Sequence, residues 1–483
     1  MTDPQFPMTQ TELGAEEPIA IPVAESGPRQ KLPPGKWLRR NLFNNWYNSL
    51  LTIVIGALLL FVAVRAFSFV FITGRWEPVR ANLTLFQIGT FPRDEEWRVV
   101  AQVLIWTAAL GLGVGAAVAG AKFRALQAGV EYVTDPALDR LKRYWALVLL
   151  LLVWLFFADT IGPLLLTVAS LALAWGGYAA ASRVSGPNVG LLWSVVGVLG
   201  VLGFQIVSGF FGLGWLWMGL PIAVAVYALL GRPDTDDVKR QRRIQLIGVL
   251  VTFAVLFGVY TAVDSVGVEW DDWEGLQLNL LAAAIAIALS FPLGLLLALA
   301  RRSSFPALRV MATTYIEIIR GVPLISLLLM AQFFIGFFLN TDTPLSLFTR
   351  AIAAMTLFTA AYVAEIVRGG LQAVPKGQME AGNSIGLPAW KVTQLIVLPQ
   401  ALRAVIPAMV GQFISLFKDT SLLLIIGKLE LLGVREIVHG QPDFRGFGIA
   451  ESLVYVAFVF WAISFTMSRE SQRLERKLGV GER

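Results

Sequence analysis

Long apolar runs constrain this chain more than any other feature of its sequence. The runs at residues 47–72, 191–209, 244–264 and 277–300 carry at most one charged residue each. About 20 apolar residues in a helix cross the ~30 Å hydrocarbon core of a bilayer. The chain is 56% hydrophobic and 15% charged, which departs from the composition of a soluble domain. We therefore predict an all-α, polytopic membrane protein.

Similar runs recur along the whole chain and predict about twelve transmembrane helices. Twelve crossings place both termini on one side of the membrane. Asp159, Gly162 and Pro163 leave open a re-entrant turn between the third and fourth spans. The spans are expected at about 47–72, 99–120, 144–160, 163–182, 191–209, 213–230, 244–264, 277–300, 312–338, 347–368, 404–426 and 449–468.

The basic residues predict the orientation, because short cytoplasmic loops are enriched in Lys and Arg. Both termini are expected in the cytoplasm, an orientation that also places basic loops 122–143, 232–243 and 301–309 there. The net charge of +6 is thereby attributed to membrane orientation, and no nucleic-acid partner is expected. Proline-rich residues 1–36 lack the apolar surface needed to fold and are predicted to be a disordered cytoplasmic tail.

Several kinds of chemistry are excluded by composition and motif. The chain has no cysteine and a single histidine, His439, so neither a disulfide framework nor a thiolate or multi-histidine metal site is expected. No G-x-x-x-x-G-K-[ST] sequence is present, so no ATPase site is expected in this chain. We predict no catalytic residue and no metal ligand. The glycine run 111–115 lies within a span, where it favours close helix packing.

A polar interruption between two apolar runs predicts a pair of short helices on the cytoplasmic side. Pro375 favours the first turn of a helix, and Gly386 can supply the left-handed residue that ends it, which gives a helix at about 375–385. Pro388 opens a second helix that is expected to stop or kink at Pro399. The polar and small residues of the first helix suggest a docking element, although a plain connecting loop fits the same spacing.

The residues of this interruption resemble a known family. Glu380-Ala381-Gly382, followed at fixed spacings by Gly386, Ile396 and Leu398-Pro399, is similar to the cytoplasmic EAA loop of permease subunits of binding-protein-dependent ABC importers, with glycine at the third motif position. Further segments resemble the polar-amino-acid permeases of the methionine-permease-like family. These segments are residues 318–324, 364–370, 372–378 and 417–422.

This resemblance implies a domain organisation. Residues 275–470 would form the five-helix core of a type I ABC importer permease, with a cytoplasmic coupling loop at 371–401. Residues 37–270 would be an N-terminal membrane extension of about seven helices, and residues 471–483 a cytoplasmic tail. A permease with such an extension resembles the M-subunit family of general L-amino-acid ABC transporters. The ATPase-coupling residues implied are Glu380, Ala381, Gly382, Gly386 and Leu387.

The resemblance also implies partners and a location. The partners are a second homologous permease subunit, two ATPase subunits that carry ATP and Mg, a periplasmic amino-acid-binding protein and membrane lipid. The location is the bacterial inner membrane, crossed several times. The N-terminal extension is expected to pack against the partner permease.

Charged residues inside spans are costly and therefore mark candidate substrate pathways. The candidates are Arg320, Glu365, Lys418, Glu317 and Gln412. Structural explanations remain open, because Glu317 could pair with Arg320 three residues later and Lys418 with Asp419. Gly321-Val322-Pro323 predicts either an unwound segment in the span at 312–338 or a simple proline kink.

Two other functions fit the apolar pattern. An ion-coupled secondary amino-acid transporter also has about twelve spans, but it should repeat its motifs in paired halves, and this motif cluster occurs once. A membrane scaffold subunit would suit the first seven spans but not the cytoplasmic helix pair. The sequence favours the ABC importer permease.

Overall fold

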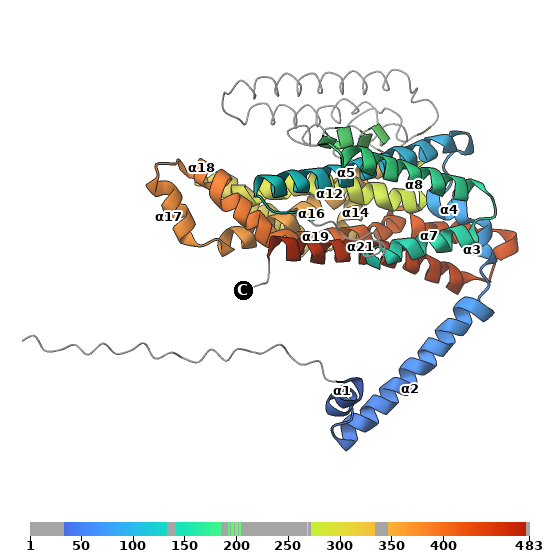
Figure 1. The fold of residues 1–483 in the computed structure, drawn as a ribbon. Helices are drawn as coiled ribbons and strands as arrows, with labels where there is room; N and C mark the ends of the chain where they lie inside the picture. The colour runs from blue at the N-terminus through green and yellow to red at the C-terminus, as the bar shows by residue number, and fades with distance from the viewer. Residues whose placement is uncertain are drawn as a thin grey trace, which may run out of the picture. The chain divides into compact units, whose positions relative to one another are not determined.

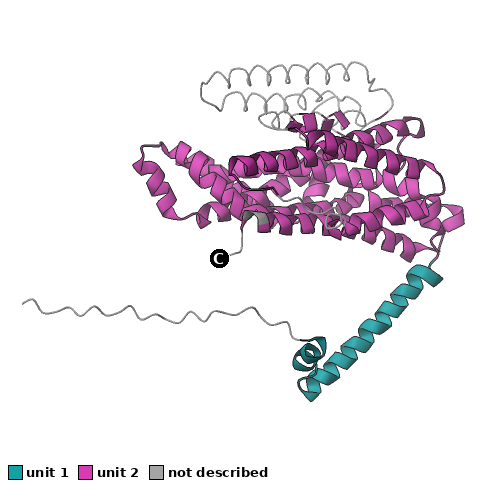
Figure 2. Ribbon diagram, viewed as in Figure 1, with its two compact units in different colours: residues 1–74 teal, residues 75–483 magenta. Residues whose placement is uncertain are grey.

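The computed structural model describes residues 33–132, 142–184, 192–193, 195–197, 199–200, 202–203, 268, 272–333 and 346–479. The predicted spans at 213–230 and 244–264 lie outside the described residues, as do most of the span at 191–209 and nearly all of the predicted tail 1–36. The chain divides into two compact units, residues 1–74 and residues 75–483 (Figure 2).

The first unit contains helix α1 (Pro34–Asn41), helix α2 (Trp46–Ser68) and a π-helical turn, η1 (Phe69–Thr73). α1 therefore starts inside the stretch predicted to be a disordered tail. α2 and η1 together match the predicted span at 47–72. None of the side chains of α2 is buried by described residues.

The second unit begins with the described part of the extension. Its helices are α3 (Glu77–Ala81), α4 (Leu83–Ile88), the 3-10 turn η2 (Arg93–Glu95), α5 (Glu96–Gln127), α7 (Trp145–Phe157) and α8 (Gly162–Ala181). α7 has 13 residues and rises about 20 Å, which is too short to cross the ~30 Å hydrocarbon core alone.

Glycines allow α5 and α8 to pack closely. A Cβ added at Gly111 would lie 2.1 Å from the carbonyl oxygen of Ala174, and one at Gly115 would lie 2.7 Å from Cβ of Ala181. Any larger residue would push the two backbones apart. The predicted role of the glycine run is confirmed for these two glycines, whereas the nearest atom to a Cβ at Gly113 is 3.7 Å away.

The rest of the second unit continues the helical architecture. Its elements are α12 (Gly275–Arg301), α13 (Pro306–Gly321), α14 (Leu324–Phe333), α16 (Leu347–Ala373), α17 (Lys376–Ser384), α18 (Ala389–Val392), π-helical η5 (Thr393–Val397), α19 (Leu398–Asp419), 3-10 η6 (Thr420–Ile426), α20 (Leu431–Gly440), 3-10 η7 (Pro442–Phe444) and α21 (Ile449–Leu478).

Among the described residues, seven helices are long and apolar enough to cross a membrane, or eight if one bent pair counts as a span. The predicted count of twelve spans is therefore not confirmed. The prediction of a helical protein that crosses the membrane several times is confirmed. The seven are Trp46–Thr73, Arg93–Gln127, Gly162–Ala181, Gly275–Arg301, Leu347–Ala373, Ala389–Ile426 and Ile449–Arg476.

The bent pair replaces the continuous span predicted at 312–338. α13 ends at Gly321 and α14 begins at Leu324, with an angle of 104° between them. Pro323 lacks an N–H and disfavours the helical conformation at the residue before it, and Val322 accordingly has extended backbone angles, φ −106° and ψ 135°. The chain is thus fully broken here, which favours the unwound segment over the simple kink.

Within the second unit, α3 and α4 of the extension share a hydrophobic core with the C-terminal helices. Val79 of α3 and Phe86 of α4 are completely buried, in one cluster with Val434 of α20 and Val459 of α21. Figure 1 shows α3 and α4 at the end of the bundle opposite α17 and α18. The second unit therefore has two distinct ends, one covered by the extension and one carrying the short helix pair.

A second cluster fills the bundle between α12 and α16. Trp273, just before α12, is completely buried in it and packs edge-on against Phe348, with ring centroids 5.2 Å apart.

Candidate functional site

The short helix α17 is the element that the sequence singled out as a docking helix. Its predicted bounds are confirmed within one residue, because Pro375 is the N-cap and Gly386 has φ +80°. The amide of Gly386 donates to Asn383 O at 2.9 Å and the amide of Leu387 donates to Gly382 O at 3.3 Å. This pair of bonds is a Schellman motif, which requires a left-handed residue where Gly386 stands.

α17 is attached to the bundle through one face only. Gly382 is its only buried residue, and a Cβ there would lie 2.9 Å from Cδ1 of Ile396 and 3.0 Å from the methyls of Val392. Glu380 and Ala381 are exposed, and Leu387 is half-buried. The structure therefore places Gly382 as the contact between α17 and the helix that follows, and leaves Glu380 directed away from the bundle's own core.

Two large apolar side chains are exposed at the tip of this helix pair. Ile385 is 74% exposed and Trp390 is 63% exposed. Ile385 directly follows α17 and Trp390 lies in α18, the two helices at one end of the bundle (Figure 1). Exposed aromatic and aliphatic side chains that lie close together are typical of a protein contact surface.

The helix predicted to stop or kink at Pro399 does not stop there. α18, η5, α19 and η6 form one continuous candidate span from Ala389 to Ile426. A proline ring in a regular α-helix collides with the carbonyl four residues earlier. Here the π-helical turn η5 (Thr393–Val397) directly precedes Pro399 and widens the helix at the position where that collision would occur.

A cavity lies between α17 and the transmembrane helices. It has a volume of about 290 Å³, and its lining includes Met379 and Asn383 of α17, Leu371 of α16 and Arg302 after α12. Nη1 of Arg302 donates to Leu371 O across 3.5 Å. The cavity thus separates part of α17 from the transmembrane helices.

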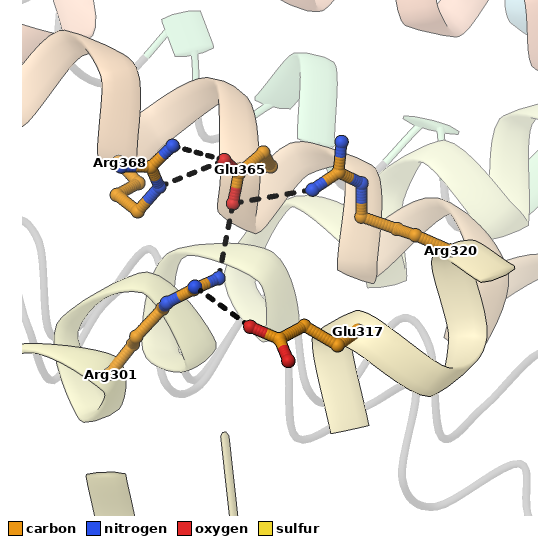
Figure 3. Close-up of polar contacts among 5 residues, drawn as sticks. All are labelled: Arg301, Glu317, Arg320, Glu365 and Arg368. Carbon is orange, nitrogen blue, oxygen red and sulfur yellow. Dashed lines mark hydrogen bonds and ion pairs between the residues drawn. The ribbon is translucent and has the colours of Figure 1, made fainter. Parts of the chain in front are cut away.

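Four of the five pathway candidates were expected to be charged groups within spans, and three of them meet in one cluster (Figure 3). Glu365 of α16 accepts from Arg301 of α12 at 3.2 Å and lies 3.5 Å from Nη1 of Arg320 of α13. Arg368, one turn after Glu365, donates to it through Nε at 2.9 Å and also through Nη2. Glu365 therefore joins three helices.

Glu317 belongs to the edge of the same cluster. It accepts from Arg301 at 3.2 Å, and its side chain is 62% exposed, compared with 21% for Glu365. The pairing of Glu317 with Arg320 on α13 is not seen, because each side chain has a partner on another helix. This arrangement can link the movements of α12, α13 and α16.

Lys418 and Gln412 do not belong to this cluster. Lys418 is exposed near the end of α19, and Gln412 is half-buried two turns earlier. Among the described residues no close ion pair joins Lys418 to Asp419, but the two charges attract each other, so the alternative that they neutralise each other stays a prediction. Both residues remain predictions as pathway residues.

Sequence reasoning did not find a second polar joint, at the opposite end of the bundle. Glu430 is completely buried and accepts from Asn279 Nδ2 at 3.0 Å and from the amides of Leu432 and Gly433 at 2.9 Å. Burial raises the pKa of its carboxyl to about 7 despite these donors. Its position as the N-cap of α20, three residues before Gly433, is the sequence signal that could have identified it.

Comparison with known proteins places these features in a family. Residues 290–480 match the family described as "Binding-protein-dependent transport system inner membrane component". The chain is 32% identical to the glutamate/glutamine/aspartate/asparagine transport system permease protein BztC of Rhodobacter capsulatus, over 99% of both chains.

Other relatives match the C-terminal part. The inner membrane amino-acid ABC transporter permease protein YhdY of Escherichia coli is 43% identical over 232 residues, which are 48% of this chain and 62% of that protein. A solved structure described as an amino acid ABC transporter with histidines shares 30% sequence identity, with a TM-score of 0.38, and covers 42% of this chain and 92% of that chain.

Proposed function

The chain belongs to the family of binding-protein-dependent transport system inner membrane components and is a permease of an ABC importer, and on that premise we propose that it moves L-amino acids inward with energy from a separate ATPase. It is a multi-pass protein of the inner membrane. The proposed orientation places α17 and both termini in the cytoplasm. The proposed partners are a second permease, two ATPase subunits that bind ATP and Mg, and a periplasmic amino-acid-binding protein.

The observation that carries this proposal is the geometry of α17. A helix whose only buried residue is Gly382, which is capped by Gly386 and flanked by exposed Ile385 and Trp390, is suited to insertion into a cleft of a partner protein. Because η5 and α19 continue without interruption from the same elbow into the bundle, a displacement of α17 is transmitted to a membrane-spanning helix. The elbow thus provides a mechanical link between an ATPase and the transport pathway.

The proposed substrates are polar L-amino acids. The relatives include transporters named for glutamate, glutamine, aspartate and asparagine. The Glu365 cluster contains three arginines and two carboxylates, so it carries an excess positive charge close to the end that bears α17. We propose that this cluster joins the three helices that must separate or close together as the pathway opens, and that Arg320 lies beside the substrate's route.

The coupling role can be tested by replacing Gly386 with valine. A β-branched residue at φ +80° is strained by about 1–2 kcal/mol, so the Schellman motif should open and α17 should lose its position. We expect about tenfold lower ATP-dependent amino-acid uptake in proteoliposomes that contain the complete transporter. Glu380→Arg should give the same defect by reversing an exposed charge, with weaker association of the ATPase.

Gly377→Ala is the matched control for this prediction. Gly377 lies on the same helix, no atom lies within 4 Å of an added Cβ, and its φ is ordinary. Normal uptake is expected in this variant. Unaltered uptake and normal ATPase association in both Gly386→Val and Glu380→Arg would contradict the proposed coupling role.

Family membership favours the ABC importer over an ion-coupled transporter, and the energy source can be tested directly. Uptake should stop when ATP is withdrawn while ion gradients are kept, and should continue when gradients are collapsed with ATP present.

A further inference from the structure

The short helix α1, which precedes the first candidate span, has an apolar face and a cationic face. A helix turns by about 100° per residue, so residues three or four positions apart lie on one side. The cationic face carries Lys36, Arg39 and Arg40. The apolar face, on the opposite side, carries Trp37, Leu38 and the C-cap residue Leu42. The two faces together make α1 an amphipathic helix.

The apolar face is a continuous exposed surface in the described part of the first unit. Trp37 is 49% exposed and Leu38 is 42% exposed. Asn41 lies between them on the same face, but its side chain has a partner within the helix, because its Nδ2 donates to Trp37 O at 2.9 Å. A polar group with such a partner costs little at an apolar boundary. The face can therefore contact an apolar medium along its whole length.

The turn between the two helices fixes α1 beside the start of α2. Oγ1 of Thr52 donates to Leu42 O across 3.0 Å, although ten residues separate the two. Within the turn, Nδ2 of Asn48 donates to Oδ1 of Asn44 at 2.6 Å. The end of α1 is thus level with the second turn of α2, and Figure 1 shows α1 beside that end of the longer helix.

This level is also where the first span becomes continuously apolar. Residues 50–64 of α2 have Thr52 as their only polar side chain, whereas Asn48 and Ser49 come directly before them. α2 and η1 form a candidate span of 28 residues. At a rise of 1.5 Å per residue the span is about 42 Å long, so it exceeds the ~30 Å hydrocarbon core and its first turns lie among the headgroups.

Aromatic residues mark the same level. Trp46 and Tyr47 open α2 and are 78% and 54% exposed, with their rings in edge-on contact at a centroid distance of 6.2 Å. Tryptophan and tyrosine gather where the headgroups meet the acyl chains. Because α1 lies beside these first turns, its apolar face lies at that boundary too.

We propose that α1 lies in the plane of the membrane surface, with its apolar face against the outer parts of the acyl chains and its cationic face at the lipid phosphates. Helices that carry tryptophan and leucine on one face and lysine and arginine on the other bind membranes in this way. The long cationic side chains can reach outward to the headgroups. They need no excess charge for this role, because every phospholipid headgroup carries a phosphate.

The occupant of the apolar face is therefore the bilayer that α2 crosses. α1 would set the depth at which the first span enters this bilayer. If α2 slid outward along its axis, Trp37 and Leu38 would enter water, and if it slid inward the cations would enter the acyl chains. Both movements cost free energy, so α1 holds the start of the span in place.

The test is site-directed spin labelling, which suits this chain because it has no cysteine of its own. A single cysteine on α1 carries a nitroxide, in the complete transporter with cysteine-free partner subunits, in vesicles of phosphatidylcholine and phosphatidylglycerol. Collisions of the nitroxide with oxygen, which concentrates in lipid, are compared with collisions with a water-soluble nickel chelate. The variants are Trp37→Cys, Leu38→Cys, Arg39→Cys and Arg40→Cys.

We expect oxygen collisions to dominate at Trp37→Cys and Leu38→Cys, and chelate collisions to dominate at Arg39→Cys and Arg40→Cys. The two pairs should differ in depth by about 10 Å, the diameter of a helix with its side chains. Leu38→Cys and Arg39→Cys are matched controls, because they are neighbours that differ only in the face they occupy.

Two outcomes would overturn the proposal. Few collisions with either reagent at Trp37→Cys and Leu38→Cys would mean that a protein surface covers the apolar face. More chelate than oxygen collisions at all four positions would mean that α1 stands in water. If Trp37→Cys does not assemble, Asn41→Cys reports on the same face.

Discussion

Glu430 is a buried side chain that joins helices at the end of the bundle opposite α17. Its carboxyl accepts from Asn279 on α12 and from two amides at the start of α20. Asn279 in turn donates to Thr420 and accepts from the amide of Leu431. The buried pair of Glu430 and Asn279 therefore fixes α20 to α12 and to the start of η6.

The raised pKa of Glu430 makes this joint sensitive to pH. Its pKa is about 7 in the folded chain, compared with about 4.5 in a solvated carboxyl. Between these values the folded state holds a proton that the unfolded state has lost, so stability falls as the pH rises through this range. The stabilisation from the raised pKa of Glu430 is complete below pH 4.5 and lost above pH 7. A pKa shift of this size corresponds to about 3 kcal/mol in the free energy of unfolding.

We predict that Glu430→Gln removes this contribution to the pH dependence, because glutamine mimics the protonated carboxyl at every pH. The measurement is the unfolding midpoint of the purified chain at pH 4.5, 6 and 8. Glu436→Gln, on the exposed side of the same α20, is the control and should leave the slope unchanged. An identical slope in wild type and Glu430→Gln would show that the buried carboxyl stays charged throughout.

At the scale of elements, helix packing in the extension depends on small residues. α5 and α8 approach so closely that backbone meets backbone, since a Cβ added at Gly177 would lie 2.9 Å from both Ala108 O and Leu112 N. In a membrane, where apolar side chains gain little by associating, such close contact is a principal source of helix association.

Two neighbouring glycines of α8 give a matched test of this packing. Gly177→Ala is expected to destabilise the α5–α8 pair by about 1–3 kcal/mol through overpacking against backbone atoms. Gly176→Ala meets no atom within 4 Å and should be neutral or slightly stabilising, because alanine has the higher helix propensity. Thermal unfolding in detergent distinguishes the two variants. Equal midpoints would mean that the helices are more loosely packed than their glycine contacts imply.

The elbow and the broken span illustrate how local sequence decides element boundaries. Pro375 and Gly386 fixed the ends of α17 because each restricts the backbone regardless of tertiary context. The same reasoning failed at Pro399, since a π-helical turn accommodates the proline ring and proline alone does not reveal that turn. Pro323 did break its helix. The angle of 104° between α13 and α14 is specified only by the packed structure.

At the scale of the second unit, the described part of the extension that belongs to it, from residue 75 onward, packs into the permease core. Phe86 of α4 packs edge-on against Tyr455 of α21, with ring centroids 5.3 Å apart. Gln277 of α12 donates to Gln102 of α5 at 3.2 Å. These residues of the extension thus contact their own chain, and the expected packing of the extension against the partner permease stays a prediction.

We predict that Phe86→Ala lowers the stability of the entire second unit, by about 3–5 kcal/mol, because it leaves a cavity among α4, α20 and α21. The loss should appear as earlier unfolding of the full-length chain and faster proteolysis of the C-terminal helices. Thr84→Ala, at an exposed position of α4, is the control. If Phe86→Ala unfolds only the extension, the two parts fold separately.

The sequence by itself determined the helical membrane class, the family and the short helices of the elbow. Each of these follows from properties that act over a few residues: apolar runs, the motif at Glu380, Ala381 and Gly382, and the backbone limits of proline and glycine. Only the tertiary structure decided which charges meet. Glu365 gathers Arg301 and Arg320 from helices far away along the chain, and nothing local to those residues specifies that they become neighbours.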